Sequence, residues 1–189
     1  MTANPGWPIA ANVVRLILYG AFVLGAAVIL GTAKGPRRRD GRARVFVASM
    51  VATFLLVAVG LLPVGPVAWE ATVRSSQIGL LIAAVGASVA VAALVSLGSN
   101  FSIVPEAHSL VVTGPYRWLR HPMYMAEFLM MLGIAVSDPR IVFLTGSIGV
   151  GALQVYRIRV EERLLSTAFP RAYEAFITST RYRLVPHVW

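Results

Sequence analysis

The sequence predicts an all-α membrane protein with about five transmembrane helices and its N-terminus outside the cytoplasm. Hydrophobic residues make up 57% of the 189 residues, above the roughly 45 to 50% that is typical of soluble domains. Long uncharged runs recur along the chain, and Lys and Arg gather in alternate connections between them. Because no polar stretch is long enough for a separate soluble domain, residues 1–189 are predicted to form a single integral membrane domain.

Three uncharged runs, 16–33, 45–62 and 78–97, approach or reach the length of about 20 helical residues that crosses a hydrocarbon core. We predict a transmembrane helix for each run. The N-terminus carries neither a basic region nor a clear cleavage site, so the first helix is expected to stay in the mature protein.

Two shorter apolar runs, 123–136 and 141–156, are separated by Ser137, Asp138, Pro139 and Arg140. Asp and Pro together signal a turn, so these runs are predicted to form a helical hairpin. A spanning hairpin is favoured. A re-entrant one stays as the alternative, since apolar runs of about 10 to 14 residues are often re-entrant.

The positions of Lys and Arg predict the orientation, because short loops rich in these residues stay in the cytoplasm. The basic groups are Lys34, Arg37, Arg38, Arg39, Arg42 and Arg44 in the first loop; Arg117 and Arg120 after the third helix; and Arg157, Arg159, Arg163, Arg171, Arg181 and Arg183 in the tail. Only Arg74 and Arg140 fall in the opposite loops. Five crossings place all three groups inside, and the expected location is the inner membrane of a bacterium or archaeon.

Composition also narrows the function. The chain has no Cys, which excludes disulfides, thiolate metal sites and cysteine nucleophiles, and no metal site is predicted.

The net charge of +9 lies where apolar runs end, so membrane lipids with anionic headgroups are the expected partner and nucleic acid is not. No internal repeat is evident, which disfavours a transporter with duplicated halves. The oligomeric state stays open.

The two ends of the predicted hairpin should meet on one face of the membrane. Two helices of about sixteen residues, rising 1.5 Å per residue, cover similar distances out and back. His121 and Tyr124 should therefore lie near Glu161 and Glu162. The cytoplasmic segments 99–124 and 157–189 are predicted to build the catalytic pocket around them.

Two stretches of the sequence resemble the sequence motifs of one known protein family. The first runs from Leu97-Gly98-Ser99-Asn100-Phe101-Ser102 through His108 and Leu110-Val111-Val112-Thr113-Gly114-Pro115-Tyr116 to Arg120-His121-Pro122-Met123-Tyr124. The second comprises Glu161-Glu162, Leu165, Phe169, Tyr173, Phe176 and Arg181-Tyr182-Arg183-Leu184-Val185-Pro186. Together they resemble the isoprenylcysteine carboxyl methyltransferase family over about half of the chain.

This resemblance implies an integral membrane methyltransferase that uses S-adenosylmethionine and a lipophilic acceptor that enters from the bilayer. The residues that it implies for the cofactor are His108, Val112, Gly114, Tyr116, His121, Pro122 and Tyr124, with Glu161 and Glu162 closing the pocket. Arg120, with Arg181 or Arg183, would face the polar group of the acceptor. A prenylcysteine-like or isoprenoid carboxylate is the favoured acceptor, which makes carboxyl O-methylation the favoured reaction.

The chemistry of the acceptor decides which side chains are needed. A carboxylate is already a nucleophile and needs mainly an Arg to orient it. An amine or thiol must lose a proton, and then His121 or Glu127 becomes the candidate base. Glu127 lies in an apolar helix, where an ionisable side chain usually faces a cavity or a partner, although it could also reach the nearby membrane border.

Each motif also has a plain structural interpretation. Pro122 suits the first turn of a helix, so His121-Pro122 could simply mark a helix start. Glu161 and Glu162 could form solvated ion pairs with neighbouring Arg residues. The competing functions are an NADPH-dependent membrane reductase of the sterol-reductase type and a non-enzymatic membrane scaffold or transporter.

Overall fold

The computed structural model describes residues 73–101, 103, 106–107, 109–137 and 141–185, with shorter pieces at 13–14, 16–17, 20–21, 23–25, 27–28, 38–39 and 45–51. Almost all of these residues are helical. The helices are α3 (Val73–Leu97), α4 (Pro122–Ser137), α5 (Ile141–Ala168) and α6 (Pro170–Ser179), with the 3₁₀ turns η1 (Gly98–Asn100) and η2 (Gly114–Arg117) and the short strands β1 (Arg38–Arg39) and β2 (Glu106–Ala107).

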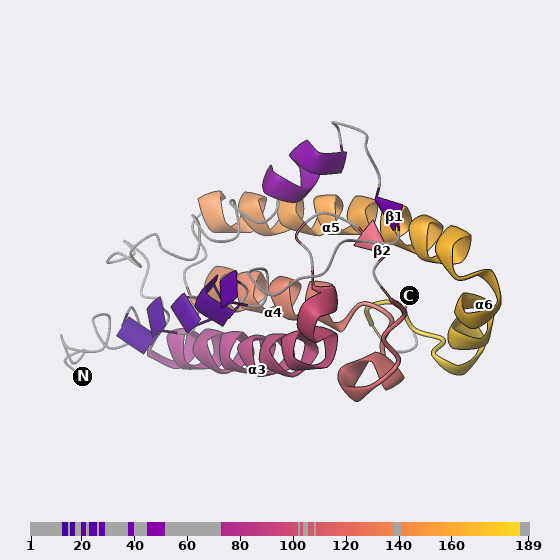
Figure 1. The fold of residues 1–189 in the computed structure, drawn as a ribbon. Helices are drawn as coiled ribbons and strands as arrows, with labels where there is room; N and C mark the ends of the chain where they lie inside the picture. Colours follow the sequence, from indigo (N-terminus) through magenta and orange to yellow (C-terminus); the bar gives the residue numbers. More distant parts are fainter. Residues whose placement is uncertain are drawn as a thin grey trace.

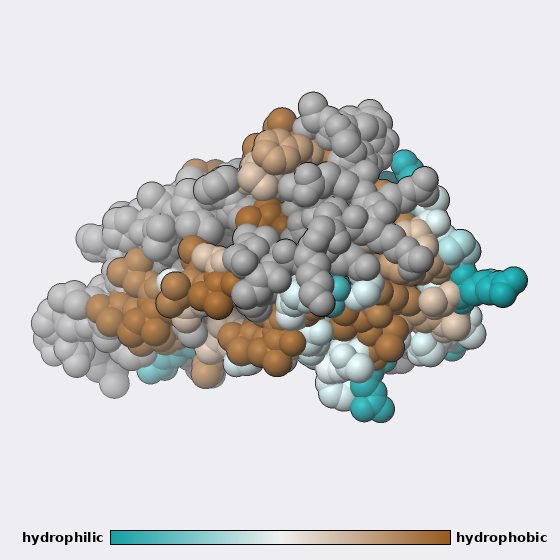
Figure 2. Space-filling view, viewed as in Figure 1, coloured by the Kyte–Doolittle hydropathy of each residue, from teal (hydrophilic) through white to brown (hydrophobic). Residues whose placement is uncertain are grey.

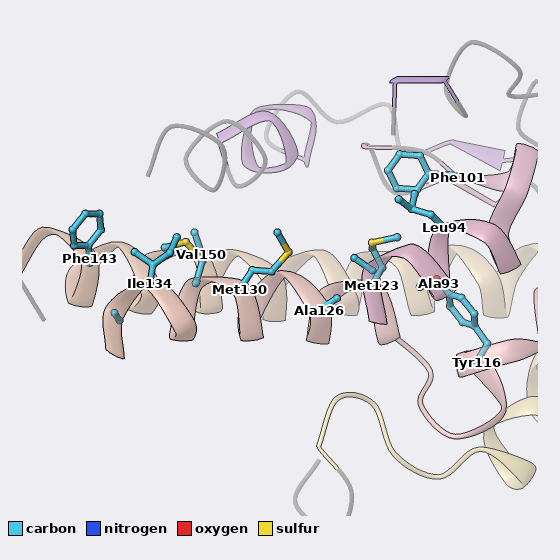
Figure 3. Close-up of a cluster of buried hydrophobic side chains, with 13 residues drawn as sticks. Ala93, Leu94, Phe101, Tyr116, Met123, Ala126, Met130, Ile134, Phe143 and Val150 are labelled. Atoms are coloured by element: carbon cyan, nitrogen blue, oxygen red, sulfur yellow. The ribbon is translucent and has the colours of Figure 1, made fainter. Parts of the chain in front are cut away.

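Helices α3, α4 and α5 run alongside one another, and α6 lies at the end where the C-terminal segment returns (Figure 1). The buried core between the three long helices includes Met130 and Ile134 of α4, Phe143 and Val150 of α5, and Leu94 of α3 (Figure 3). A second apolar cluster joins β2, the end of α5 and α6 through Ala107, Leu165, Tyr173 and Phe176. The second cluster holds α6 against the end of α5.

The crossing of α3 and α4 is very close because small residues face each other there. A Cβ atom placed on Gly133 would lie only 2.5 Å from the carbonyl oxygen of Gly79 and 2.7 Å from the amide nitrogen of Ala83. A Cβ on Gly86 would lie 2.9 Å from the carbonyl oxygen of Ala126. Such contacts let the two backbones touch, as in the small-residue interfaces of membrane helices.

The third predicted span and both helices of the predicted hairpin are confirmed as helices. One boundary was wrong: α5 continues to Ala168 instead of ending near residue 156. The apolar run does end there, but Arg157 to Ala168 contains good helix formers and no Gly or Pro, so the helix continues as a polar extension. Pro170 then begins α6, a helix that was missed although Tyr173, Phe176 and Ile177 recur at helical spacing.

Within the described residues, one helix, Gln77–Asn100, is both long enough and apolar enough to cross a bilayer, and Pro122–Ser137 is a shorter apolar helix. Exposed apolar side chains include Leu81 and Val95 on α3 and Ile148 on α5. Hydrophilic residues gather mostly at the end that carries α6 (Figure 2). The described residues of the first predicted span, and residues 45–51 of the second, are helical; residues 52–62 lie outside the described part. The number of crossings and their direction stay predictions.

The first basic loop takes part in a contact that the sequence did not suggest. Strand β1 pairs antiparallel with β2, with Arg38 opposite Ala107 and Arg39 opposite Glu106. Both strands also contact α5. The backbone of Arg38 and Arg39, from a loop that was expected to orient the protein and to meet anionic headgroups, is thus paired with the segment that leads into the candidate site.

Candidate functional site

The segment before α4 is shaped by a glycine and a proline. Gly114 has φ +58°, a left-handed conformation that costs little only for glycine, and a Cβ there would collide with Ser96 on α3. This close approach brings Tyr116 into the apolar core. Pro122 then begins α4, a position that proline favours.

The C-terminal tail segment, which we define as residues 180–183, lies along residues 119–121. Leu119 and Tyr182 form a parallel bridge. The amide of Arg120 donates to the carbonyl of Tyr182 at 2.9 Å, and the amide of His121 donates to that of Arg183 at 3.0 Å. Pairing of this kind fixes the tail segment beside the start of α4.

Glu162 on α5 is where these elements meet. Its carboxylate accepts hydrogen bonds from Nε of Arg183 at 2.9 and 3.0 Å and lies 2.9 Å from Nη2 of the same residue. Nη1 of Arg120 and Nε2 of His121 lie 3.4 and 3.5 Å away. Burial opposes the charge, but the interactions with His121 and Arg183 outweigh it and lower the pKa of Glu162 to about 2.

Glu161 stands on the other side of the same histidine. Its Oε2 lies 3.8 Å from Nδ1 of His121, and its side chain is 28% exposed, against 12% for Glu162. The predicted meeting of the hairpin ends is therefore present, with His121 between the two carboxylates. The two acids differ, since Glu162 anchors the tail segment while Glu161 is the more accessible.

A buried polar network lies nearly two helical turns beyond His121, around Glu127 of α4. Glu127 accepts a hydrogen bond from Gln154 and lies 3.7 Å from Nη1 of Arg157. Arg157 also donates to Gln154 at 3.0 Å and to the carbonyl of Ile103 at 2.7 Å, and its guanidinium carbon lies 4.8 Å from the ring centre of Tyr124. The network thus connects α4, α5 and the segment after α3.

The other predicted site residues are placed as follows. Val112 is 47% exposed, and His108 lies outside the described residues. Arg181 has an exposed side chain. Arg120, expected to face an acceptor, is directed at backbone carbonyls of α6 and the tail segment.

Reasoning from the sequence missed Gln154, Arg157 and Thr180. Gln154 and Arg157 are three positions apart and share a helix face, and a polar residue inside an apolar run was the available signal. The sequence predicts Arg157 only as a member of the basic tail group and as a neighbour of Glu161 in solvated ion pairs. Thr180 has no sequence signal, because its role depends on how the tail segment docks.

The low pKa of Glu162 predicts how stability depends on pH. The carboxyl pKa falls from 4.5 to about 2 on folding, so its ion pairs stabilise the fold fully above about pH 4.5 and are lost as pH falls toward 2. Thermal unfolding in detergent should show an acid-sensitive component between these values. Glu162→Gln should remove that component, whereas Glu174→Gln, an exposed change on α6, should keep it. Equal acid sensitivity of the native protein and Glu162→Gln would contradict the assignment.

Comparison with known proteins places the site in a family context. The family described as phospholipid methyltransferase (PEMT) matches residues 75–172, which include α4, most of α3 and both glutamates. Protein-S-isoprenylcysteine O-methyltransferase of Homo sapiens is 38% identical over 66 residues, and the match covers 32% of this chain and 23% of that protein. The match to the Mus musculus protein of the same name has the same extent. The match therefore spans less than a quarter of the length of each of these two relatives.

Two further similarities extend over more of the chain. The cobalt-zinc-cadmium resistance protein CzcN of Cupriavidus metallidurans is 30% identical over 134 residues, which are 70% of this chain and 60% of that protein. The structure of the eukaryotic intramembrane Ras methyltransferase ICMT (isoprenylcysteine carboxyl methyltransferase) matches with a TM-score of 0.58 and 17% identity, over 93% of this chain and 68% of the other. The structural match shows a shared fold.

Proposed function

The chain belongs to the phospholipid methyltransferase (PEMT) family of membrane methyltransferases, and from that premise we propose that it transfers a methyl group from S-adenosylmethionine to a lipophilic acceptor in the membrane. The observation that carries the proposal is the convergence of His121, Glu161 and Glu162 with the tail segment. These elements are far apart in sequence, and the matched family region includes all three residues.

The side chains present suit this cofactor. It carries hydroxyl and ammonium groups, which a carboxylate can bind, and a carboxylate, which N–H donors can bind. Glu161 is an accessible acid, and Nε2 of His121 faces Glu162 at 3.5 Å without a well-formed hydrogen bond. Within the described part of the chain, Nε of Arg157 is also buried without a hydrogen-bond partner. We propose that Glu161, His121 and Tyr124 hold the cofactor, with Val112, Gly114, Tyr116, Pro122 and, outside the described residues, His108 shaping its surroundings.

The protein's main task in this reaction is alignment. S-adenosylmethionine supplies an electrophilic methyl group on a sulfonium, whose positive charge disappears as the methyl leaves. The tail segment, anchored through Glu162, would exclude water from the site and fix the approach of the two reactants.

The acceptor is proposed to be a lipid-like carboxylate that reaches a cytoplasmic site from the bilayer. Arg181, with its exposed side chain, is the Arg proposed to orient the carboxylate. Glu127 is proposed to border the acceptor, where its pairing with Arg157 keeps the buried charge compensated. Surrounding lipids with anionic headgroups would meet the basic loops.

Calorimetry with S-adenosylhomocysteine tests the reaction class. The detergent-purified protein should bind it saturably and should not bind NADPH. Glu161→Gln should weaken binding by about ten- to a hundredfold, since one charge-assisted hydrogen bond contributes about 1.5 to 3 kcal/mol.

The matched control is Glu174→Gln on α6, which removes an exposed acid outside the site and should leave the affinity unchanged. Binding of NADPH in place of S-adenosylhomocysteine would support the reductase alternative. Binding of neither would support a non-enzymatic role.

A further inference from the structure

Arg120 makes an unusual number of contacts with one short stretch of backbone. Its Nε donates to the carbonyl of Thr180 at 2.7 Å, and its Nη2 donates to the carbonyls of Arg181 at 3.0 Å and Ile177 at 3.4 Å. Its Nη1 lies 3.4 Å from Glu162. All three guanidinium nitrogens therefore have protein partners, and the side chain is only 13% exposed.

We propose that Arg120 is a positioning residue that fastens the tail segment to the start of α4; we call its contacts with Ile177, Thr180 and Arg181 the clamp. Arg120 thus acts on the site through the tail segment and not by binding the acceptor. An acceptor carboxylate could take a two-point contact with Arg120 only by displacing at least one of these backbone carbonyls, because both donors of Nη2 are already used. The effect on ligand binding rests on the proposed function, whereas the effect on the tail segment does not.

The end of α6 explains why an Arg is suited to this position. The last carbonyls of a helix have no partner within the helix and carry partial negative charge, so a cation placed there is stabilising. α6 ends at Ser179, and Arg120 reaches Ile177 within its last turn and Thr180 just beyond it. Arg120 thus satisfies the end of α6 from a segment 57 to 61 positions away in sequence.

A second set of bonds fixes the same junction from the other direction. The hydroxyl of Thr180, a residue only 4% exposed, lies 3.4 Å from the carbonyl of Arg117 and 3.5 Å from that of Tyr116. The amides of Arg120 and His121 donate to the tail segment. Since the same two residues carry these amides and face Glu162 with their side chains, docking of the tail segment and the geometry around Glu162 are coupled.

Lysine cannot replace this arginine. A guanidinium presents donors in several directions of one plane, whereas an ammonium is a compact charge on a flexible stem. Arg120→Lys keeps the positive charge beside Glu162 but cannot reach the carbonyls of Ile177, Thr180 and Arg181 together. Arg120→Lys removes the planar guanidinium but keeps the positive charge, whereas Arg120→Gln removes both. Comparing the two substitutions therefore separates the role of the charge from the role of the guanidinium hydrogen bonds.

Hydrogen exchange tests the clamp directly. In the full-length protein in detergent, the amides of residues 120 and 121 should exchange at least about tenfold faster in Arg120→Gln, and nearly as fast in Arg120→Lys, because their acceptors on the tail segment are released. Arg159→Gln, an exposed change on α5, should leave this exchange unchanged. Native exchange in Arg120→Lys would overturn the proposal, and this milder variant decides the question if Arg120→Gln does not fold.

Binding of S-adenosylhomocysteine tests whether the clamp reaches the site. Both Arg120 variants should raise its dissociation constant by about tenfold while the melting temperature of Arg120→Lys stays close to the native value. Faster exchange with unchanged binding would overturn the link between the clamp and the site. If the native protein binds no S-adenosylhomocysteine, the proposed function fails, and the exchange measurement still decides the clamp.

Discussion

Glu162→Gln is expected to weaken S-adenosylhomocysteine binding by more than about a hundredfold and to abolish methyl transfer. Glutamine keeps the size of the side chain but leaves Arg183 and Arg120 facing a neutral group at 2.9 and 3.4 Å. Arg183 is 36% exposed and so loses less, whereas Arg120 and Glu162 are only 13% and 12% exposed. Removing one partner of a pair as buried as Arg120 and Glu162 costs about 3 to 5 kcal/mol because the other charge stays uncompensated, and each 1.4 kcal/mol is a factor of ten. Calorimetry measures the first effect, and a radiolabelled methyl transfer assay on membranes measures the second.

A double-mutant cycle separates anchoring of the tail segment from direct ligand contact. If Glu162 acts through Arg183, then Arg183→Gln should weaken binding similarly, and the variant with both changes should be little worse than either alone. Fully additive losses would show that Glu162 acts independently of Arg183. Glu174→Gln is the control, since it removes an exposed acid of α6 and should leave binding unchanged.

The meeting of His121 with Glu161 and Glu162 was predictable because it depends mainly on helix geometry and on α4 and α5 being joined by a short connection. The different roles of the two acids were not predictable. Adjacent glutamates are equivalent in a sequence pattern, and the distinction arises because the tail segment docks on one of them. Arg120 illustrates the same limit, since its side chain is directed by the docked position of α6, which a sequence pattern does not give.

The fold was predictable where burial in lipid or in the core leaves a long apolar run, as in α3 and α4. It was less predictable where a helix leaves that environment. α5 continues beyond Tyr156 for about three turns. Val160, Leu164 and Ala168 recur there at helical spacing, but the end of the long apolar run was interpreted as the start of a polar tail. The pairing of β1 with β2 joins residues almost seventy positions apart through two pairs only, which is too short for an alternating pattern.

Gly133→Leu is expected to prevent folding, and Gly133→Ala should lower the melting temperature by roughly 2 to 8 °C. Alanine improves helix propensity by about 1 kcal/mol, but its Cβ would lie 2.5 Å from the carbonyl oxygen of Gly79 and 2.8 Å from the Cβ of Ala83. Backbone atoms cannot move aside as a flexible side chain can, so α3 and α4 must separate. Overpacking of this kind costs about 1 to 3 kcal/mol, and leucine enlarges the clash.

Gly149→Ala is the matched control, because Gly149 on α5 has no atom within 4 Å of an added Cβ. Gly149→Ala raises the helix propensity, as Gly133→Ala does, but creates no clash. Its melting temperature should therefore equal or exceed that of the native protein. A difference between the two alanine variants therefore measures the helix crossing alone. If Gly133→Ala melts at the native temperature in detergent, α3 and α4 do not pack backbone to backbone. Since α4 begins directly after His121, a shift of this crossing would also displace His121 from the two glutamates, so lost S-adenosylhomocysteine binding should accompany the lost stability.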